Sequence, residues 1–347
     1  MISVISMPPI LLPENRKMTM KAIASAALAG VLVTGLALSA HAVEIGSKEA
    51  FDFVAFGDMP YSIPDDYPAF EKVLARINAI KPNLAINVGD LKSGSSPCTD
   101  ANILKIRDYF ETVEVPLLYS IGDNEWTDCH RERAGKFDPL ERLARLREWF
   151  FATDQSLGKT KVKVVRQADV MPQFKLYVEN TRYEHNRIVF VQPHIPGSNN
   201  NFEAQNQKTA NEYFDRDKAN VAWIRAAFDR AKEINAAGVV ISFQANLWDI
   251  RQTFPEIPPA SGFVNSIRAI ERSAKDFDKP VLVIHGDEHE FIISPFQNTS
   301  FKPVPKITRL QLMGEKTIGA VRVIVDPNDP DVFIGFSPFY IDNPKKN

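Results

Sequence analysis

Four aspartates follow a glycine at points where a short apolar run ends. Asp58, Asp90 and Asp123 each close such a run, and Asp287 closes another, with His289 close behind it. A glycine at such a point lets the chain turn sharply and brings the backbone close to whatever the carboxylate holds. Carboxylates that converge on one place repel each other unless a cation compensates their charge. The pattern therefore predicts a divalent metal site built from these side chains.

The elements that must position these residues are short apolar runs alternating with amphipathic stretches. The apolar runs predict strands, and stretches with apolar residues at helical spacing predict helices. Such alternation implies parallel strands joined by right-handed crossovers. Ligands of open α/β sheets bind outside the carboxyl ends of the strands, which is where the aspartates stand. Strands are expected at residues 51–56, 84–88, 115–121, 238–243 and 280–284, and helices at 67–80, 101–113, 139–150, 220–234 and 261–275.

The remaining β patterning is of a different kind. Residues 174–191 predict a hairpin with its turn among 180–186, and the tail, 307–340, alternates in the manner of strands separated by Gly and Pro turns. We expect the tail to add antiparallel strands to a parallel interior. Because no linker divides the chain after its N-terminal segment, residues 43–347 are predicted to form one α/β domain.

Composition bears on the partners. The chain has 347 residues, of which 44% are hydrophobic and 24% charged, and its formal net charge is −2. This is an ordinary globular composition, with enough residues for one large core. The near-neutral charge balance gives no electrostatic argument for nucleic acid or an anionic membrane as a partner.

The N-terminal segment has the pattern of an export signal. Basic residues, Arg16, Lys17 and Lys21, precede an uncharged run over residues 22–40, which ends in the small-x-small pattern of residues 40–42. We interpret residues 1–42 as a cleaved signal peptide, which predicts a periplasmic or secreted protein with no membrane association after cleavage. An uncleaved membrane anchor is the alternative, because the apolar run approaches spanning length.

The cysteines are consistent with export. Cys98 and Cys129 are the only two, and both lie in loop-like sequence. In an oxidising compartment they are expected to form a disulfide, and the alternative is a pair of free thiols. The absence of C-x-x-C spacing gives no indication of a redox motif or a zinc knuckle.

Five stretches of the sequence, the first to fifth block in chain order, resemble the five motif blocks of the calcineurin-like metallophosphoesterases. Together they span most of the chain that follows the N-terminal segment. The resemblance implies a two-sheet α/β sandwich, flanked by helices, with a centre that holds two divalent metal ions. It implies that Asp90 bridges the ions and that the substrate is a small phosphorylated molecule. The matching stretches are residues 57–61, 89–94, 122–125, 239–246 and 286–289, and the metal ligands that they imply are Asp58, Asp90, Asp123, Gln244, Asp287 and His289.

The sequence departs from the family pattern at several positions. Pro60 stands where a metal-binding His is expected, Asp123 stands in the place of Asn, and Asp287 in the place of His. The lone His of the fourth block is replaced by amides, either Gln244 or Asn246. The site thus leans from imidazole toward oxygen ligands, which favours Mg²⁺, Mn²⁺ or Ca²⁺ over Zn²⁺.

The catalytic positions are the least regular. Asn124 stands where the family has a His that serves as general acid or holds the phosphate, and an amide cannot shuttle a proton at neutral pH. His130, His194 and His285 are the candidates for that role, and Lys92 or Arg131 is the candidate for neutralising phosphate charge. Tyr61 follows the first block, where its ring either walls the pocket or only packs at its rim.

Two classes of function stay open. The first is a metal-dependent hydrolase of phosphate monoesters or diesters that uses a metal-activated water. The second is a weak or inactive member of the same fold with a ligand-binding or structural role, because fold alone does not settle function. The lost imidazoles favour the second, and the oxygen ligands retained in their places favour the first.

Overall fold

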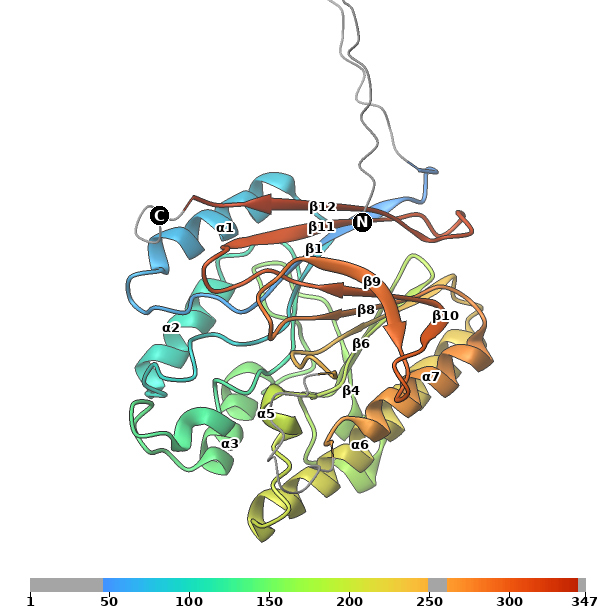
Figure 1. The fold of residues 1–347 in the computed structure, drawn as a ribbon. Coiled ribbons are helices and arrows are strands. Elements are labelled where there is room, and N and C mark those ends of the chain that lie inside the picture. The colour runs from blue at the N-terminus through green and yellow to red at the C-terminus, as the bar shows by residue number, and fades with distance from the viewer. Residues whose placement is uncertain (1–45, 249–260, 343–347) are drawn as a thin grey trace, which may run out of the picture. The chain divides into compact units, whose positions relative to one another are not determined.

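A computed structural model describes residues 46–248 and 261–342, which belong to one compact unit. The predicted signal peptide, residues 1–42, lies outside these ranges. The described chain forms two mixed β-sheets that are packed face to face, with helices on their outer faces (Figure 1). The predicted α/β sandwich is therefore confirmed.

The first sheet has five strands in the order β12-β11-β1-β2-β3. Its members β1, β2 and β3 are parallel, whereas β11 pairs antiparallel with β1 and β12 pairs antiparallel with β11. The bounds are β1 Phe51–Phe56, β2 Leu84–Asn87, β3 Leu117–Tyr119, β11 Gly319–Val325 and β12 Phe333–Tyr340.

The second sheet has seven strands in the order β4-β5-β6-β7-β8-β10-β9. Its interior strands, β6, β7, β8 and β10, are parallel, and β5 and β9 flank them as antiparallel strands. Strand β4 pairs antiparallel with β5 at the edge of the sheet. The bounds are β4 Val165–Arg166, β5 Thr181–His185, β6 Ile188–Gln192, β7 Gly238–Ser242, β8 Val281–His285, β9 Ile292–Gln297 and β10 Pro303–Gln311.

Helices cover the outer face of each sheet. The first sheet carries α1 Tyr67–Ile80, α2 Asp100–Phe110 and α3 Pro139–Phe150, and the second carries α6 Gln207–Glu233 and α7 Val264–Phe277. Short helical turns complete the described chain: η1 Thr127–His130, α4 Gln167–Val170, η2 Pro172–Phe174 and α5 Gly197–Asn200. None of the helices in the described ranges has the length and apolar content that a bilayer crossing requires.

Three apolar layers hold the sandwich together. The middle layer lies between the sheets and joins alternate residues of both, such as Phe53 and Ile86 from one and Val240 and Leu282 from the other. The remaining residues of the same strands face outward, under the helices. Strands that are buried on both faces read as continuous apolar runs, which is why the runs in the sequence mark them.

Several expected elements differ in extent or direction. The hairpin at 174–191 exists as β5 and β6, but its turn lies at residues 186–187 and its first strand begins only at Thr181. Helix α6 begins at Gln207, well before the expected residue 220. In the tail, β11 and β12 are antiparallel as expected, whereas β10 pairs parallel with β8. Strand β9 was not expected from the sequence.

Candidate metal centre

The loops at the carboxyl ends of β1 and β2 bring Asp58 and Asp90 together. The amide of Asp58 donates a hydrogen bond to the carbonyl of Gly89 at 2.9 Å. A side chain at Gly89 would place its Cβ 2.5 Å from the backbone nitrogen of Gly122, so only glycine allows the β2 and β3 loops to approach this closely. The parallel register of β1, β2 and β3 thus delivers the predicted aspartates to one edge of the sheet.

The backbone at the candidate ligands is strained. Asp58, Asp90, Asp287 and His289 all have positive φ angles, of 53°, 58°, 79° and 63°. Positive φ is uncommon for residues other than glycine, and residues held in such conformations cluster at functional sites. The surrounding structure therefore holds these particular side chains in place at some cost to folding.

Ligand atoms of Asp58, Asp90 and His289 lie within 4.8 Å of one another. Both carboxylates are fully buried, and the Asp58 Oδ2 atom has no hydrogen-bond partner among the described residues. Burial raises the pKa of both carboxyls well above their ordinary range, and neighbouring acidic groups, among them Asp123, raise it further. A buried acidic cluster with an orphaned oxygen and an adjacent imidazole is a donor set that fits a divalent cation.

The other predicted ligands, Asp123, Gln244 and Asp287, surround this cluster and bond to neighbouring groups. The Asp123 carboxylate accepts a hydrogen bond from the Ser198 hydroxyl at 2.6 Å, and Gln244 Oε1 accepts one from the amide of Gly197. Asp287 accepts from the amide of Asn246 at 2.8 Å, and its own amide donates to Asp58 Oδ1 at 3.1 Å. Their oxygens retain lone pairs for a cation, and their role as ligands stays a prediction.

Glu125 organises the loops beneath the cluster. Its Oε1 atom accepts hydrogen bonds from the amides of Gly122 at 2.7 Å and Asp90 at 3.2 Å and from the Tyr119 hydroxyl at 2.8 Å. The side chain is completely buried. Glu125 directly follows Asn124 in the third block, and this place in the motif is the sequence feature that could have marked it as a functional residue.

The predicted catalytic residues lie in different surroundings. Asn124 is in the cluster, where its Nδ2 atom donates to Asp90 Oδ2 at 2.7 Å. His194 is buried nearby against Trp126, and its Nδ1 atom is 3.0 Å from Glu179 Oε1. His130 is exposed, with its Nδ1 atom 2.7 Å from the carbonyl of Thr127. Within the described chain no hydrogen bond or ion pair joins either histidine to Asp58 or Asp90, and their role as proton donors stays a prediction.

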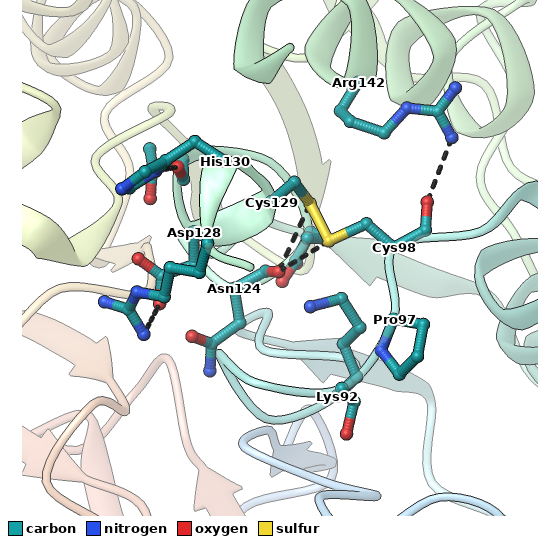
Figure 2. Close-up of a disulfide and its surroundings, with 12 residues drawn as sticks. Lys92, Pro97, Cys98, Asn124, Asp128, Cys129, His130 and Arg142 are labelled. Carbon is teal, nitrogen blue, oxygen red and sulfur yellow. Dashed lines mark hydrogen bonds and ion pairs between the residues drawn. A yellow bond between two sulfur atoms is a disulfide. The ribbon is translucent and has the colours of Figure 1, made fainter. Parts of the chain in front are cut away.

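The predicted disulfide is present and underlies the third block. Cys98 and Cys129 are bonded, with their Cα atoms 5.7 Å apart. Both sulfurs contact the carbonyl oxygen of Asn124, at 3.7 and 3.8 Å (Figure 2). The disulfide therefore joins the loop after β2 to the loop after β3 and supports the residue that holds Asp90.

Lys92 is a buried cation beside this acidic site. Its side chain is 1% exposed, and its ammonium group donates to the carbonyl of Ser93 at 3.1 Å. Burial lowers the pKa of Lys92 to about 8, although the carboxylates of Glu125 and Asp90 oppose the shift. Its charge offsets part of the repulsion among the buried carboxylates.

No family model matches the sequence, and no curated protein matches it. Solved structures do match the fold. A dimetal phosphatase from Danio rerio has 10% sequence identity and a TM-score of 0.50, and the match covers 84% of this chain and 99% of that one. This chain has a metallophosphoesterase-like fold.

Two further structures are similar at lower TM-scores. A purple acid phosphatase from yellow lupin, Lupinus luteus, has 10% identity and a TM-score of 0.43, with 84% of this chain and 54% of that chain covered. GAP50, the anchor in the inner membrane complex of Plasmodium, has 11% identity and a TM-score of 0.43, with 84% and 89% covered. At these levels of identity the likeness concerns the fold alone, and the chemistry must be argued from the site.

Proposed function

We propose that this protein is an exported, metal-dependent hydrolase of small phosphate esters. The observation that carries the proposal is the buried cluster of Asp58, Asp90 and His289, whose ligand atoms lie within 4.8 Å of one another. The cluster lies at the carboxyl ends of β1, β2 and β8, where ligands of α/β sheets bind, and the fold is similar to that of a dimetal phosphatase. Both observations support the proposal.

In this proposal Asp58, Asp90 and His289 hold one divalent ion, and Asp90 shares a second with Asp123, Gln244 and Asp287. Divalent ions supply charge that polarises a phosphoryl group and lowers the pKa of water. The oxygen-rich donor set favours Mn²⁺, Mg²⁺ or Ca²⁺ over Zn²⁺. Asn124 keeps Asp90 in position through its 2.7 Å hydrogen bond.

Export is supported by the disulfide, since such bonds persist in oxidising compartments. It agrees with the signal peptide that residues 1–42 predict. We therefore place the hydrolase in the periplasm or outside the cell.

A binding or structural role is the second candidate. It is favoured by Asn124 and Pro60, which stand where the resembled family has imidazoles and leave the cluster with one histidine, His289. A protein of this kind would hold a phosphorylated ligand without turning it over.

The deciding experiment combines metal analysis with turnover. Purified protein is loaded with each of Mg²⁺, Mn²⁺, Ca²⁺ and Zn²⁺, its metal content is measured, and aryl phosphate monoesters and diesters are supplied. We expect bound divalent ions and hydrolysis that a chelator abolishes. Bound metal without turnover of any ester would favour the binding role. A protein that holds no divalent ion at millimolar supply would contradict the metal centre itself.

A further inference from the structure

The Tyr61 hydroxyl lies among the candidate metal ligands and not at the rim of the site. Its oxygen is 2.9 Å from Asp90 Oδ2 and 2.8 Å from His289 Nε2, and it is 2.9 Å from Asn124 Nδ2. The rings of Tyr61 and His289 meet edge to face, with centroids 4.7 Å apart. Tyr61 thus touches two members of the three-residue cluster through its one polar atom.

In the protonation state that metal binding requires, the Tyr61 hydroxyl cannot donate to both of its neighbours. An ionised Asp90 and a His289 with a free Nε2 lone pair are both acceptors, and the hydroxyl has a single proton to donate. One of the two contacts, at 2.8 or 2.9 Å, then joins two oxygen or nitrogen atoms with no hydrogen between them. A cation shared by the three atoms removes this conflict.

The distances agree with a shared cation. In an octahedral site with ligands about 2.1 Å from the ion, neighbouring ligand atoms are about 3.0 Å apart. The Tyr61 oxygen lies 2.9 Å from Asp90 Oδ2 and 2.8 Å from His289 Nε2, so it occupies a place that a further ligand would take. On the other side of the cluster, Asp58 Oδ1 is 3.7 Å from His289 Nε2.

The backbone of Tyr61 is fixed independently of the cluster. Its amide donates to Asp66 Oδ2 at 3.2 Å, and its carbonyl accepts from the amide of Ser93 at 3.3 Å and from the Ser96 hydroxyl at 3.2 Å. Pro60, the residue before it, has no side-chain donor atom with which to bind a metal. The loop therefore holds the Tyr61 phenol at the cluster, whereas Pro60 has no donor atom to contribute there.

We propose that Tyr61 is a ligand of the divalent ion held by Asp58, Asp90 and His289, and that its oxygen replaces the donor that Pro60 lacks. The inference rests on the proposed metal centre. On binding, a bond forms between the phenolic oxygen and the ion, the O–H bond breaks, and the proton passes to the solvent. A free phenol stays protonated at neutral pH, so an ionised phenol is a signature of the bound ion.

Ultraviolet difference spectroscopy tests this, because ionised and neutral tyrosine absorb at different wavelengths. Zn²⁺ or Mn²⁺ is added at pH 7 to chelator-treated wild type, Tyr61→Phe and Tyr67→Phe. Tyr67 is a half-buried phenol on α1 and serves as the matched control. We expect a tyrosinate signal in step with metal binding in wild type and Tyr67→Phe, and none in Tyr61→Phe.

Titration calorimetry in buffers of different ionisation enthalpy supplies a second readout. We expect Tyr61→Phe to bind the ion at least about tenfold more weakly and to release one proton fewer than wild type. If wild type binds the ion with no tyrosinate signal, or if the signal survives in Tyr61→Phe, Tyr61 is not a ligand and the proposed function still stands. If wild type binds no divalent ion, both the ligand role and the proposed metal centre are overturned.

Discussion

At the scale of single residues, Asp90 has hydrogen-bond contacts with several residues of the site. Its carboxylate accepts from Asn124 and contacts Tyr61, and its amide donates to Glu125. Burial and the charges of Asp123 and Glu125 disfavour its ionised form in the absence of a cation. The same carboxylate is therefore expected to weaken the metal-free fold and to strengthen metal binding.

We predict that Asp90→Asn changes these two properties in opposite directions. Divalent affinity should fall by more than the roughly 10- to 100-fold that follows loss of a residue supporting a ligand. The chelator-treated variant should unfold at the same temperature as chelator-treated wild type or higher, because a repelled buried charge is removed. Calorimetry and thermal denaturation measure both, with the exposed Asp108→Asn as control. Unchanged affinity would remove Asp90 from the centre.

The leaving group should matter because Asn124 cannot donate a proton. A missing general acid costs roughly 10²- to 10⁴-fold in rate when the leaving group is poor, and much less when it is good. We predict measurable hydrolysis of aryl phosphate esters, far slower hydrolysis of alkyl esters, and a smaller gap in Asn124→His. The measurement is the dependence of rate on leaving-group pKa in both proteins.

Equal rates on aryl and alkyl esters would show that a proton donor exists elsewhere. His194 and His130 would then be the first residues to replace. A gap that Asn124→His leaves unchanged would mean that the side chain at position 124 does not face the leaving group.

At the scale of elements, the disulfide connects the loops that carry two blocks of the site. It closes a separation of 31 residues, which corresponds to about 3–4 kcal/mol of stability in the chain-entropy model. Arg142 of α3 donates to the carbonyl of Cys98 at 3.1 Å and so attaches a helix to the same point (Figure 2).

We predict that reduction lowers both the melting temperature and the divalent affinity. The affinity should fall because the sulfurs support the backbone of Asn124, which in turn holds Asp90. Thermal denaturation and calorimetry with and without reductant provide the comparison. A Cys98→Ser/Cys129→Ser variant should resemble reduced wild type and should not respond to reductant. Two free thiols in oxidised material, counted by alkylation and mass spectrometry, would refute the pairing.

The strands that build the site could be predicted from the sequence, whereas some flanking elements could not. Strands buried on both faces are continuous apolar runs, and their ends are marked by Gly-Asp. Strand β9 contains Pro295 and alternates only weakly in burial, so no run identifies it. The first half of α6 buries polar residues, Arg216 and Asn220, which bond to the carbonyl of His194, and no apolar periodicity shows this in advance.

The directions of the side chains in the loops could not be predicted from the sequence either. The position of Asp58 and Asp90 at the ends of neighbouring parallel strands predicted their convergence, because such strands end at one edge of a sheet. His289 follows β8 in the other sheet, and the packing of the two sheets brings it to the same place. The direction of the Tyr61 ring depends on contacts with residues 29 and 228 positions away. No local sequence pattern encodes such contacts. The sequence therefore could not show whether Tyr61 lines the pocket, packs at its rim or serves as a metal ligand.

At the scale of the whole molecule, stability should respond to acid through a buried histidine. Burial lowers the pKa of His194 to about 4, despite its contact with Glu179, from an ordinary value of about 6.5. A depressed pKa contributes stability that is fully present above about pH 6.5 and is lost as the pH falls toward about 4. The contribution amounts to about 3 kcal/mol at neutral pH.

We predict that His194→Asn loses less stability than wild type between pH 7 and pH 4. An asparagine amide can replace the Nδ1–H donor toward Glu179 and does not titrate. Urea denaturation of chelator-treated protein gives the unfolding free energy at each pH, and the difference between the two proteins isolates the histidine. The exposed His130→Asn is the control and should follow wild type. Parallel profiles for wild type and His194→Asn would contradict the assignment.

The hydrogen bond from the amide of Asp287 to the carboxylate of Asp58 has a consequence for how the two sheets unfold. It spans 229 positions of sequence and joins the end of β8, in one sheet, to the end of β1, in the other. An ion bound at this point would favour only conformations in which both strand ends are closed. Amide hydrogens of β1 and β8 should therefore exchange with deuterium as a single cooperative unit when the ion is present. Once a chelator removes the ion, their exchange should accelerate together, while amides of α3 keep their protection.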